Sequence, residues 1–215
     1  TSSKLKGRAM ATPTAAAGIA FDVQLFPGML APYGEQVATA KRRQAAVWRG
    51  EKPDAWPIIL HGGTLTPEQE AIPVANLEEA FYDPERMLCT QTKQSLCMLQ
   101  GGSDGVPSIR GNFGAATLLA CAGLEQLVFP DKMPWLQEHL SKEQVVGMTP
   151  DDFQIQGTFE RGLEFMRYAR AILGDSLAIY CMDMQGPLDL AHLLVGDALF
   201  YEMYDAPQFV HHVLE

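Results

Sequence analysis

Apolar residues recur at helical spacing in three long stretches of the chain. The steps of three and four residues run through residues 34–50, 83–101 and 157–173, and each stretch has polar residues on the opposite side. Asp83 followed by Pro84 is typical of a helix start, because an aspartate side chain accepts backbone N–H bonds and proline fits the first turn. The sequence therefore predicts three amphipathic helices.

Short apolar runs between these helices predict strands, at residues 56–60, 106–110, 124–129 and 177–182. The last run is apolar throughout, which suits a strand buried on both faces of a parallel sheet. A helix is predicted directly after it, beyond Gly186 and Pro187. Residues 130–150 are predicted to be a connection with one short helix, in which Trp135 packs in the core. Strands that alternate with helices favour an α/β fold with crossover connections.

Length and composition indicate one main domain. The 215 residues are 47% hydrophobic, which is enough for one well-buried core and too few for two comfortable domains. Residues 1–34 are rich in Ala, Gly and Pro and lack periodicity, so we expect an irregular arm with at most a short helix. We assign residues 1–50 to an N-terminal arm and helix, and residues 51–215 to the α/β domain.

Charge and apolar run lengths exclude several kinds of partner. The formal net charge is −10 and the pI about 4.9. Nucleic-acid binding needs clustered Lys and Arg, so this balance argues against it and against an anionic membrane surface. No apolar run approaches the roughly 20 residues of a membrane span. The first 21 residues imitate a signal peptide faintly, but Pro13 and Gly18 break the apolar part.

The four cysteines favour a reducing compartment. Cys89, Cys97, Cys121 and Cys181 show no C-x-x-C spacing, and all lie within apolar segments. This is the pattern of reduced thiols packed in a core. We therefore expect a cytoplasmic protein without disulfides.

Polar residues follow three of the predicted strands, where parallel α/β sheets place their chemistry. The candidate substrate-binding residues are His61, Asn112, Asp183, Gln185 and Asp189. Four of them have a structural role as an alternative. His61 would cap a turn, and Asp183 would accept hydrogen bonds from a neighbouring strand loop. Gln185 would bond to backbone groups of its turn, and Asp189 would cap the following helix. His192, His211 and His212 are interpreted as structural or exposed histidines.

Several stretches carry a family resemblance. They are Q-G-P-L-D-L-A-H-L-L-V-G with the Y-E-M-Y-D-A-P-Q-F-V-H-H-V-L-E tail, R-G-E-K-P-D-A-W-P-I-I-L, and G-N-F-G-A-A-T-L-L-A-C-A-G-L-E. Together they resemble the uroporphyrinogen decarboxylase superfamily, which holds the haem-pathway decarboxylase and zinc-dependent methyltransferases that work with corrinoid proteins. The resemblance implies a (β/α)8 TIM barrel. Such a barrel typically needs about 250 residues, so this chain is expected to supply roughly the first half.

The decarboxylase branch fits poorly at the residues that the resemblance implies. Its first strand ends in a loop with two arginines, whereas the loop from His61 to Thr66 has no Arg or Lys. Asn112 is the polar residue nearest to the position of its catalytic aspartate, and a neutral amide cannot balance a developing positive charge. Leu193 stands at the position of its active-site tyrosine. We therefore expect no uroporphyrinogen decarboxylation.

The methyltransferase branch holds zinc with a His-x-Cys pair and a distant Cys, all in the second half of the barrel. This chain has no His-x-Cys sequence, so zinc and a corrinoid carrier would act through residues outside it. The leading hypothesis is a methyltransferase-like protein that binds a small methylated substrate. The alternatives are a decarboxylase of another substrate and a non-catalytic half-barrel subunit. Open sheet edges are a liability, so we also expect a homo-oligomer.

Overall fold

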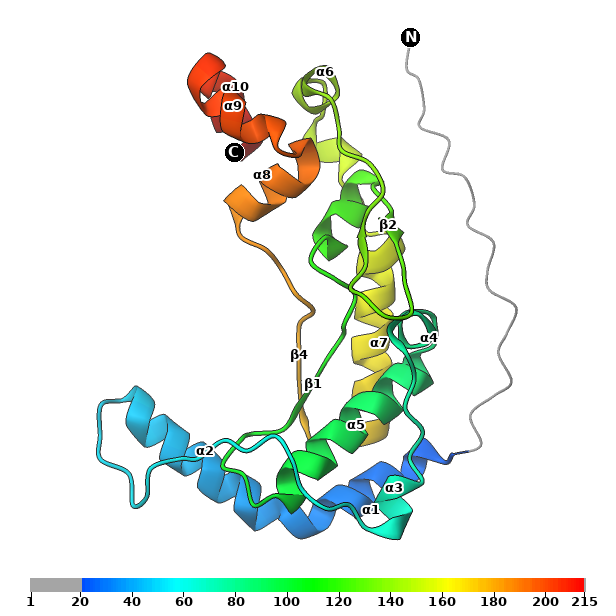
Figure 1. Ribbon diagram of the computed structural model, residues 1–215, viewed down its shortest axis with the longest axis vertical. Coiled ribbons are helices and arrows are strands. Elements are labelled where there is room, and N and C mark those ends of the chain that lie inside the picture. Colours follow the sequence, from blue (N-terminus) through cyan, green and yellow to red (C-terminus); the bar gives the residue numbers. More distant parts are fainter. Residues whose placement is uncertain (1–20, 215) are drawn as a thin grey trace.

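The computed structural model describes residues 21–214, and the prediction for residues 1–20 lies outside this part. Helical turns begin at once, with η1 (Val23–Leu25), α1 (Phe26–Leu30) and η2 (Ala31–Tyr33), which lead into α2 (Gly34–Trp48) (Figure 1). Residues 23–33 are therefore more helical than the predicted irregular arm with at most a short helix. Packing against the rest of the molecule favours these helical turns, because Phe26 and Leu30 are buried in the core that contains α7.

The helix predicted over residues 83–101 is confirmed as α5 (Pro84–Gln100). Two short helices that the sequence did not predict, α3 (Pro67–Glu70) and α4 (Leu77–Tyr82), precede it. The carboxylate of Asp83 accepts the N–H groups of Glu85 and Arg86 at 3.0 and 3.2 Å, which satisfies donors that the first turn leaves unpaired. The predicted apolar stripe of α5 is buried, at Leu88, Thr92, Leu96 and Leu99. Helix α7 (Gly157–Leu173) has the predicted bounds.

Two parallel strands form the sheet at the centre of the molecule. β1 (Ser108–Arg110) pairs with β4 (Ala178–Tyr180), with Ile109 opposite Ile179. The chain between them contains α7, which packs against the sheet, so β1, α7 and β4 form one β-α-β unit. The other elements between the strands are η3 (Thr117–Ala122), β2 (Gln126–Leu127), β3 (Trp135–Leu136), α6 (Lys142–Val146) and η4 (Pro150–Asp152).

Two of the four predicted strands do not join this sheet. Residues 56–60 form no strand, although the N–H of Ile58 bonds to the Asp104 carboxylate and that of Leu60 to the Ser103 hydroxyl. Residues 124–129 contribute only β2, which pairs antiparallel with β3 in a separate hairpin. The described residues therefore form a helix-rich α/β fold without a closed barrel.

Exposure also corrects three burial predictions. β4 is covered on one side only, since Ile179 is half-buried whereas Ala178 and Tyr180 on the opposite face are exposed. Cys181 is exposed rather than packed in a core. Trp135 is 52% exposed because it lies in the β2–β3 hairpin rather than beneath a barrel strand.

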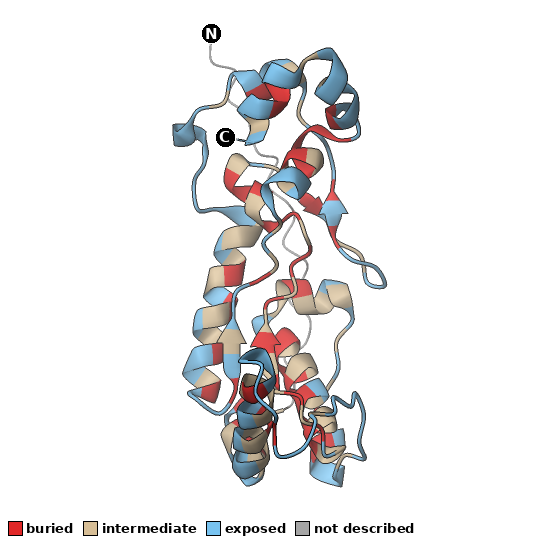
Figure 2. Cartoon of the chain, turned by 90° about the vertical axis from the view of Figure 1, so that its left-hand side faces the viewer, coloured by how far each residue is buried: buried red, intermediate tan, exposed pale blue. Residues whose placement is uncertain are grey.

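Three helices end the chain: α8 (Pro187–Val195), α9 (Ala198–Asp205) and α10 (Pro207–Leu214). They share a second apolar cluster with α6 and η3, apart from the main cluster around α1, α5 and α7. Figure 1 shows that α2 projects at one end of the molecule and α8–α10 at the other, with β1 and β4 lining the hollow side between them. In Figure 2, buried residues follow the central strands and the inner faces of the helices.

Candidate functional site

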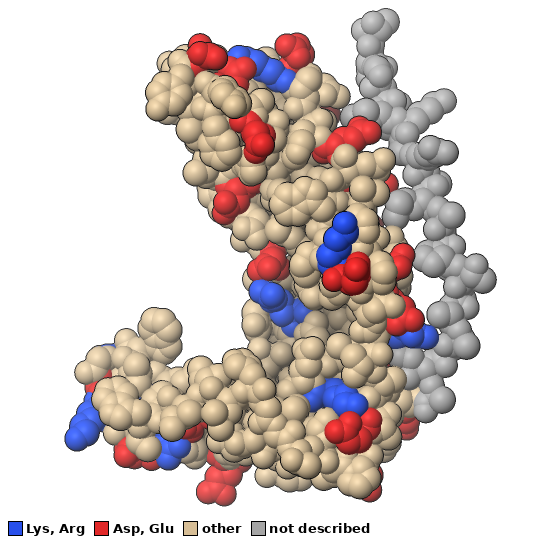
Figure 3. Space-filling view, viewed as in Figure 1, with Lys and Arg blue, Asp and Glu red and all other residues tan. Residues whose placement is uncertain are grey.

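The carboxyl ends of β1 and β4 carry an ion pair. Arg110 is the last residue of β1, and its Nη1 donates to Oδ1 of Asp183, three residues beyond the end of β4, at 2.9 Å. The two side chains are 41% and 45% exposed, so both keep access to solvent. Figure 3 shows basic and acidic side chains meeting in the middle of the hollow face. The pair therefore offers a guanidinium and a carboxylate to a ligand at the strand ends.

Arg110 is held in place through its backbone. Its N–H donates to Oε1 of Gln91 on α5 at 2.8 Å, and its carbonyl accepts from Nε2 of the same side chain. The carboxamide thus makes the two bonds that a neighbouring strand would make at this residue. The edge of β1 away from β4 is consequently closed at Arg110.

Asn112 lies beyond Arg110 in a turn that two glycines make possible. A Cβ on Gly111 would collide with the rings of Phe113 and Phe165. Gly114 has a φ of 81° and lies against Gln126, whose Nε2 donates to the Phe113 carbonyl at 3.0 Å. This tight turn keeps Asn112, which is half-buried, at the carboxyl end of β1.

Gln185 and Asp189 lie between β4 and α8. Gln185 is half-buried in the turn, and Asp189 is exposed in the first turn of α8. The N-cap residue of this helix is Gly186, and no side chain caps it with a hydrogen bond. Asp189 therefore favours the helix start through its charge rather than by a capping bond. Asn112, Asp183, Gln185 and Asp189 all follow the carboxyl ends of the two strands, as predicted.

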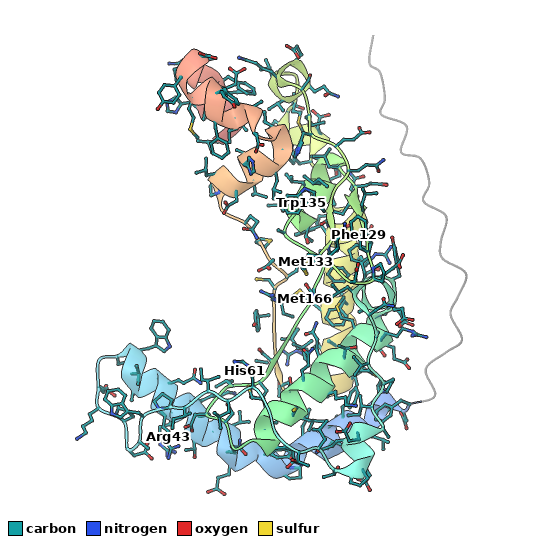
Figure 4. The ribbon with its side chains drawn as sticks, in the orientation of Figure 1. Arg43, His61, Phe129, Met133, Trp135 and Met166 are labelled. Carbon is teal, nitrogen blue, oxygen red and sulfur yellow. The ribbon has the colours of Figure 1, made fainter. Side chains whose placement is uncertain are left out.

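His61 lies at the opposite end of β1. It lines a cavity of about 500 Å³ together with Gly105, Val106, Pro107 and Ser108, which precede or begin that strand; Gln44, Gln91, Gln94, Ser95 and Cys97 complete most of the wall. Figure 4 places His61 near the end of the hollow closer to α2. His61 therefore does not join the other four candidates, because residues 56–60 are not a strand of the sheet.

Hydrogen bonds among Arg43, Asp54, Asp104 and Ile58, here called the Asp104 latch, hold the segment before His61 against α2. Arg43 donates to Asp104 at 2.8 Å and also bonds to Asp54, while the Asp104 N–H donates to the Ile58 carbonyl at 2.8 Å. The N–H of Ile58 and, next, the Arg43 guanidinium keep the pKa of Asp104 below its usual value. The latch explains why residues 56–60 lie along α2 rather than beside β1.

The other titratable residues offer no zinc site within residues 21–214. No group of three or more His, Cys, Asp or Glu side chains in this part could hold a metal ion. His192 bonds to Asp197 at 2.9 Å, and His211 and His212 are exposed, as expected. Burial raises the pKa of the Cys89 thiol to about 12, so its nucleophilic thiolate is scarce near neutral pH.

Two residues of this region were not predicted from the sequence. Arg110 was interpreted only as the last residue of a strand, although a cation directly before G-N-F-G was a usable signal. Gln91 lies on a different element, 19 residues earlier, and no local pattern indicates its bonds to Arg110.

Comparison with known proteins identifies the fold. No protein-family model matches the chain, and no curated protein matches its sequence. Among solved structures, a methyltransferase from Methanosarcina mazei matches with a TM-score of 0.59 and 22% identity, over 81% of this chain and 51% of that one. The chain thus spans about half the length of that protein. At this identity the likeness shows a shared fold. In addition, no helix within residues 21–214 is long and apolar enough to cross a membrane.

Proposed function

We propose that this chain is the substrate-binding part of a methyltransferase-like protein of the uroporphyrinogen decarboxylase superfamily. A small methylated molecule would bind where β1 and β4 end. The observation that carries this proposal is the Arg110–Asp183 pair across the two carboxyl ends, with Asn112 and Gln185 in the adjoining turns. Parallel α/β sheets bind their ligands at the carboxyl ends of their strands. The likeness to a methyltransferase supports the choice of chemistry.

Each side chain has a distinct role in this proposal. Arg110 and Asp183 orient the polar part of the molecule, because both are charged and remain accessible beside each other. Asn112 and Gln185 supply amide groups that donate and accept hydrogen bonds. Zinc and a corrinoid carrier would act through residues outside this chain, because the described residues do not fit a zinc site.

Binding to the 215-residue chain tests the proposal. Calorimetry with a panel of methylated amines, thiols and ethers should find a ligand whose affinity falls about tenfold or more in Asp183→Asn and in Arg110→Gln, the loss expected for a hydrogen bond to a charged group. His61→Ala is the matched control and should leave the affinity unchanged, because His61 lies at the other end of β1. Equal losses in all three variants would contradict the proposed site.

Decarboxylation of another substrate is a second candidate. The observation that favours it is Arg110, a cation at a strand end that could hold a carboxylate. A carboxylate ligand that releases carbon dioxide without metal would support this alternative. In a protein that also holds the zinc-binding residues expected outside this chain, transfer of a methyl group to free cob(I)alamin, followed by its absorbance, would support the methyltransferase instead. A non-catalytic half-barrel subunit would show neither reaction.

A further inference from the structure

The cavity at the amino end of β1 has a volume of about 500 Å³, and every residue of its wall lies within residues 44–108. One face of α5 contributes Gln91, Ser95 and Met98, which follow one another at steps of four and three residues. Residues 105–108, which lead into β1, form the facing wall. The volume lies within the roughly 300–1,000 Å³ of small-molecule sites. A small ring compound therefore fits this space.

The cavity lies along the edge of β1 that faces away from β4. At Arg110 this edge is covered by the Gln91 carboxamide, which bonds to the N–H and to the carbonyl of that residue. Residues two apart in a strand direct their backbone groups to the same edge. Ser108 lines the cavity two residues before Arg110, so it directs its own N–H and carbonyl into the cavity.

Residues 56–60 do not cover this part of the edge, because the Asp104 latch holds them elsewhere. The N–H of Ile58 donates to the Asp104 carboxylate at 3.1 Å, and the Ile58 carbonyl accepts the N–H of Asp104 at 2.8 Å. The apolar segment that the sequence offers as a neighbouring strand is thus fixed against α2. Within residues 21–214, the edge of β1 at Ser108 is therefore left without a neighbouring strand.

The side chains of the cavity wall are polar or apolar rather than charged. Ser95 is 5% exposed, and its hydroxyl has no hydrogen-bond partner within residues 21–214. A buried hydroxyl of this kind favours a ligand that supplies the missing bond. The described residues of the wall include no Asp, Glu, Lys or Arg, and Ile59, Met98 and Val106 add apolar surface. The cavity therefore favours a neutral ligand with an apolar body and a few polar groups.

We propose that this cavity binds a small neutral ring compound with a carboxamide or lactam group. The Gln91 side chain shows the fit, because a carboxamide already joins the N–H and the carbonyl of Arg110 on the same edge. The amide of the ligand bonds to the backbone of Ser108 in the same way. Its ring lies against the apolar residues, and the Ser95 hydroxyl supplies a further hydrogen bond. This site is separate from the one at the carboxyl ends of the strands and does not depend on methyl transfer.

NMR of the ¹⁵N-labelled chain with benzamide as the probe tests the proposal. We expect a Kd of about 1 mM or tighter, with shifts of the Ser108 backbone amide and the Gln94 side-chain amide and none at Asn112. Methyl benzoate cannot donate a hydrogen bond and benzoate is charged, so each should shift the Ser108 signal at least tenfold more weakly. No binding of benzamide, shifts at Asn112 instead, or equal affinity for the three compounds would overturn the proposal.

Ser95→Ala tests the buried hydroxyl. It should weaken benzamide binding about three- to tenfold, the loss expected for one hydrogen bond. Ser176→Ala is the matched control, since Ser176 is exposed before β4, and it should leave the affinity unchanged. Asp183→Asn should leave it unchanged as well, which separates this cavity from the proposed substrate site. Circular dichroism verifies that the variants fold. Equal affinity in Ser95→Ala and in the unsubstituted chain would overturn the proposed role of the cavity.

Discussion

The side chain of Met182 occupies the space beside Gly162 of α7, where a Cβ at residue 162 would overlap the methionine sulfur. Met182 is 2% exposed and follows β4, while Gly162 is buried in the middle of the helix. The absence of a side chain at residue 162 thus lets the helix lie close to the end of β4. Because Met182 directly precedes Asp183, this contact helps to fix the position of Asp183 beyond the end of β4.

Substitution of Gly162 should therefore loosen the strand end. We expect Gly162→Ala to lower the free energy of unfolding by about 1–3 kcal/mol, as overpacking of a filled core does. Gly34→Ala is the control, because a Cβ there meets nothing within 4 Å in the first turn of α2. It should be neutral or stabilise by a few tenths of a kcal/mol. Urea unfolding followed by circular dichroism measures both.

The latch at Asp104 should make stability depend on acid. The folded-state pKa of Asp104 is lowered, mainly by the Ile58 N–H and then by Arg43, from the roughly 3.9 of an unfolded chain. Its contribution is therefore complete above about pH 4 and is lost as the pH falls through the lower folded-state pKa. Unfolding free energies measured between pH 6 and 2.5 should fall less steeply in Asp104→Asn. An equal slope in the variant would show that the latch is not titrating.

The Arg110–Asp183 pair should contribute little to stability. Its side chains are 41% and 45% exposed, and such pairs typically contribute less than about 1 kcal/mol and are screened by salt. A double-mutant cycle with Arg110→Gln and Asp183→Asn should give a coupling free energy below about 1 kcal/mol, and lower still in 1 M NaCl. A larger, salt-independent coupling would indicate a structural pair rather than one that is available to a ligand.

The thiols should differ in reactivity according to burial. Burial, and then the charge of Glu85, raises the pKa of Cys89 to about 12, so its thiolate is scarce at pH 8. Cys181 is exposed and should react with a maleimide first. Mass spectrometry of briefly labelled protein should find the label on Cys181 and none on Cys89 until the chain unfolds. Early labelling of Cys89 would contradict the packing of α5.

Local sequence signals predicted the helices well. The Asp83 cap and the 3.6-residue stripe define α5, and the stripe of Phe165, Ala169 and Leu173 defines α7, because both signals act within a few residues. They failed for residues 56–60 and 124–129. An apolar run becomes a strand only if a partner is available, and here Asp104 and the β2–β3 hairpin provide other pairings.

The candidate site was partly predictable for the same reason. Asp183 and Gln185 follow a strand and precede a helix, and that order can be found in the sequence. The sequence predicts Arg110 only as part of a strand. Its hydrogen bond to Gln91 depends on how α5 packs against β1, which no local pattern shows. The prediction for His61 depends on residues 56–60 forming a barrel strand, and they form none.

Binding of a ligand at the carboxyl ends of β1 and β4 can be followed through the side-chain amide signals of the residues there. A ¹⁵N-labelled chain would be titrated with the tightest methylated ligand and followed by NMR. We expect the side-chain amide signals of Asn112 and Gln185 to shift, whereas those of Gln44 and Gln94, beside His61, should stay in place. Shifts at Gln44 and Gln94 with none at Asn112 and Gln185 would contradict it.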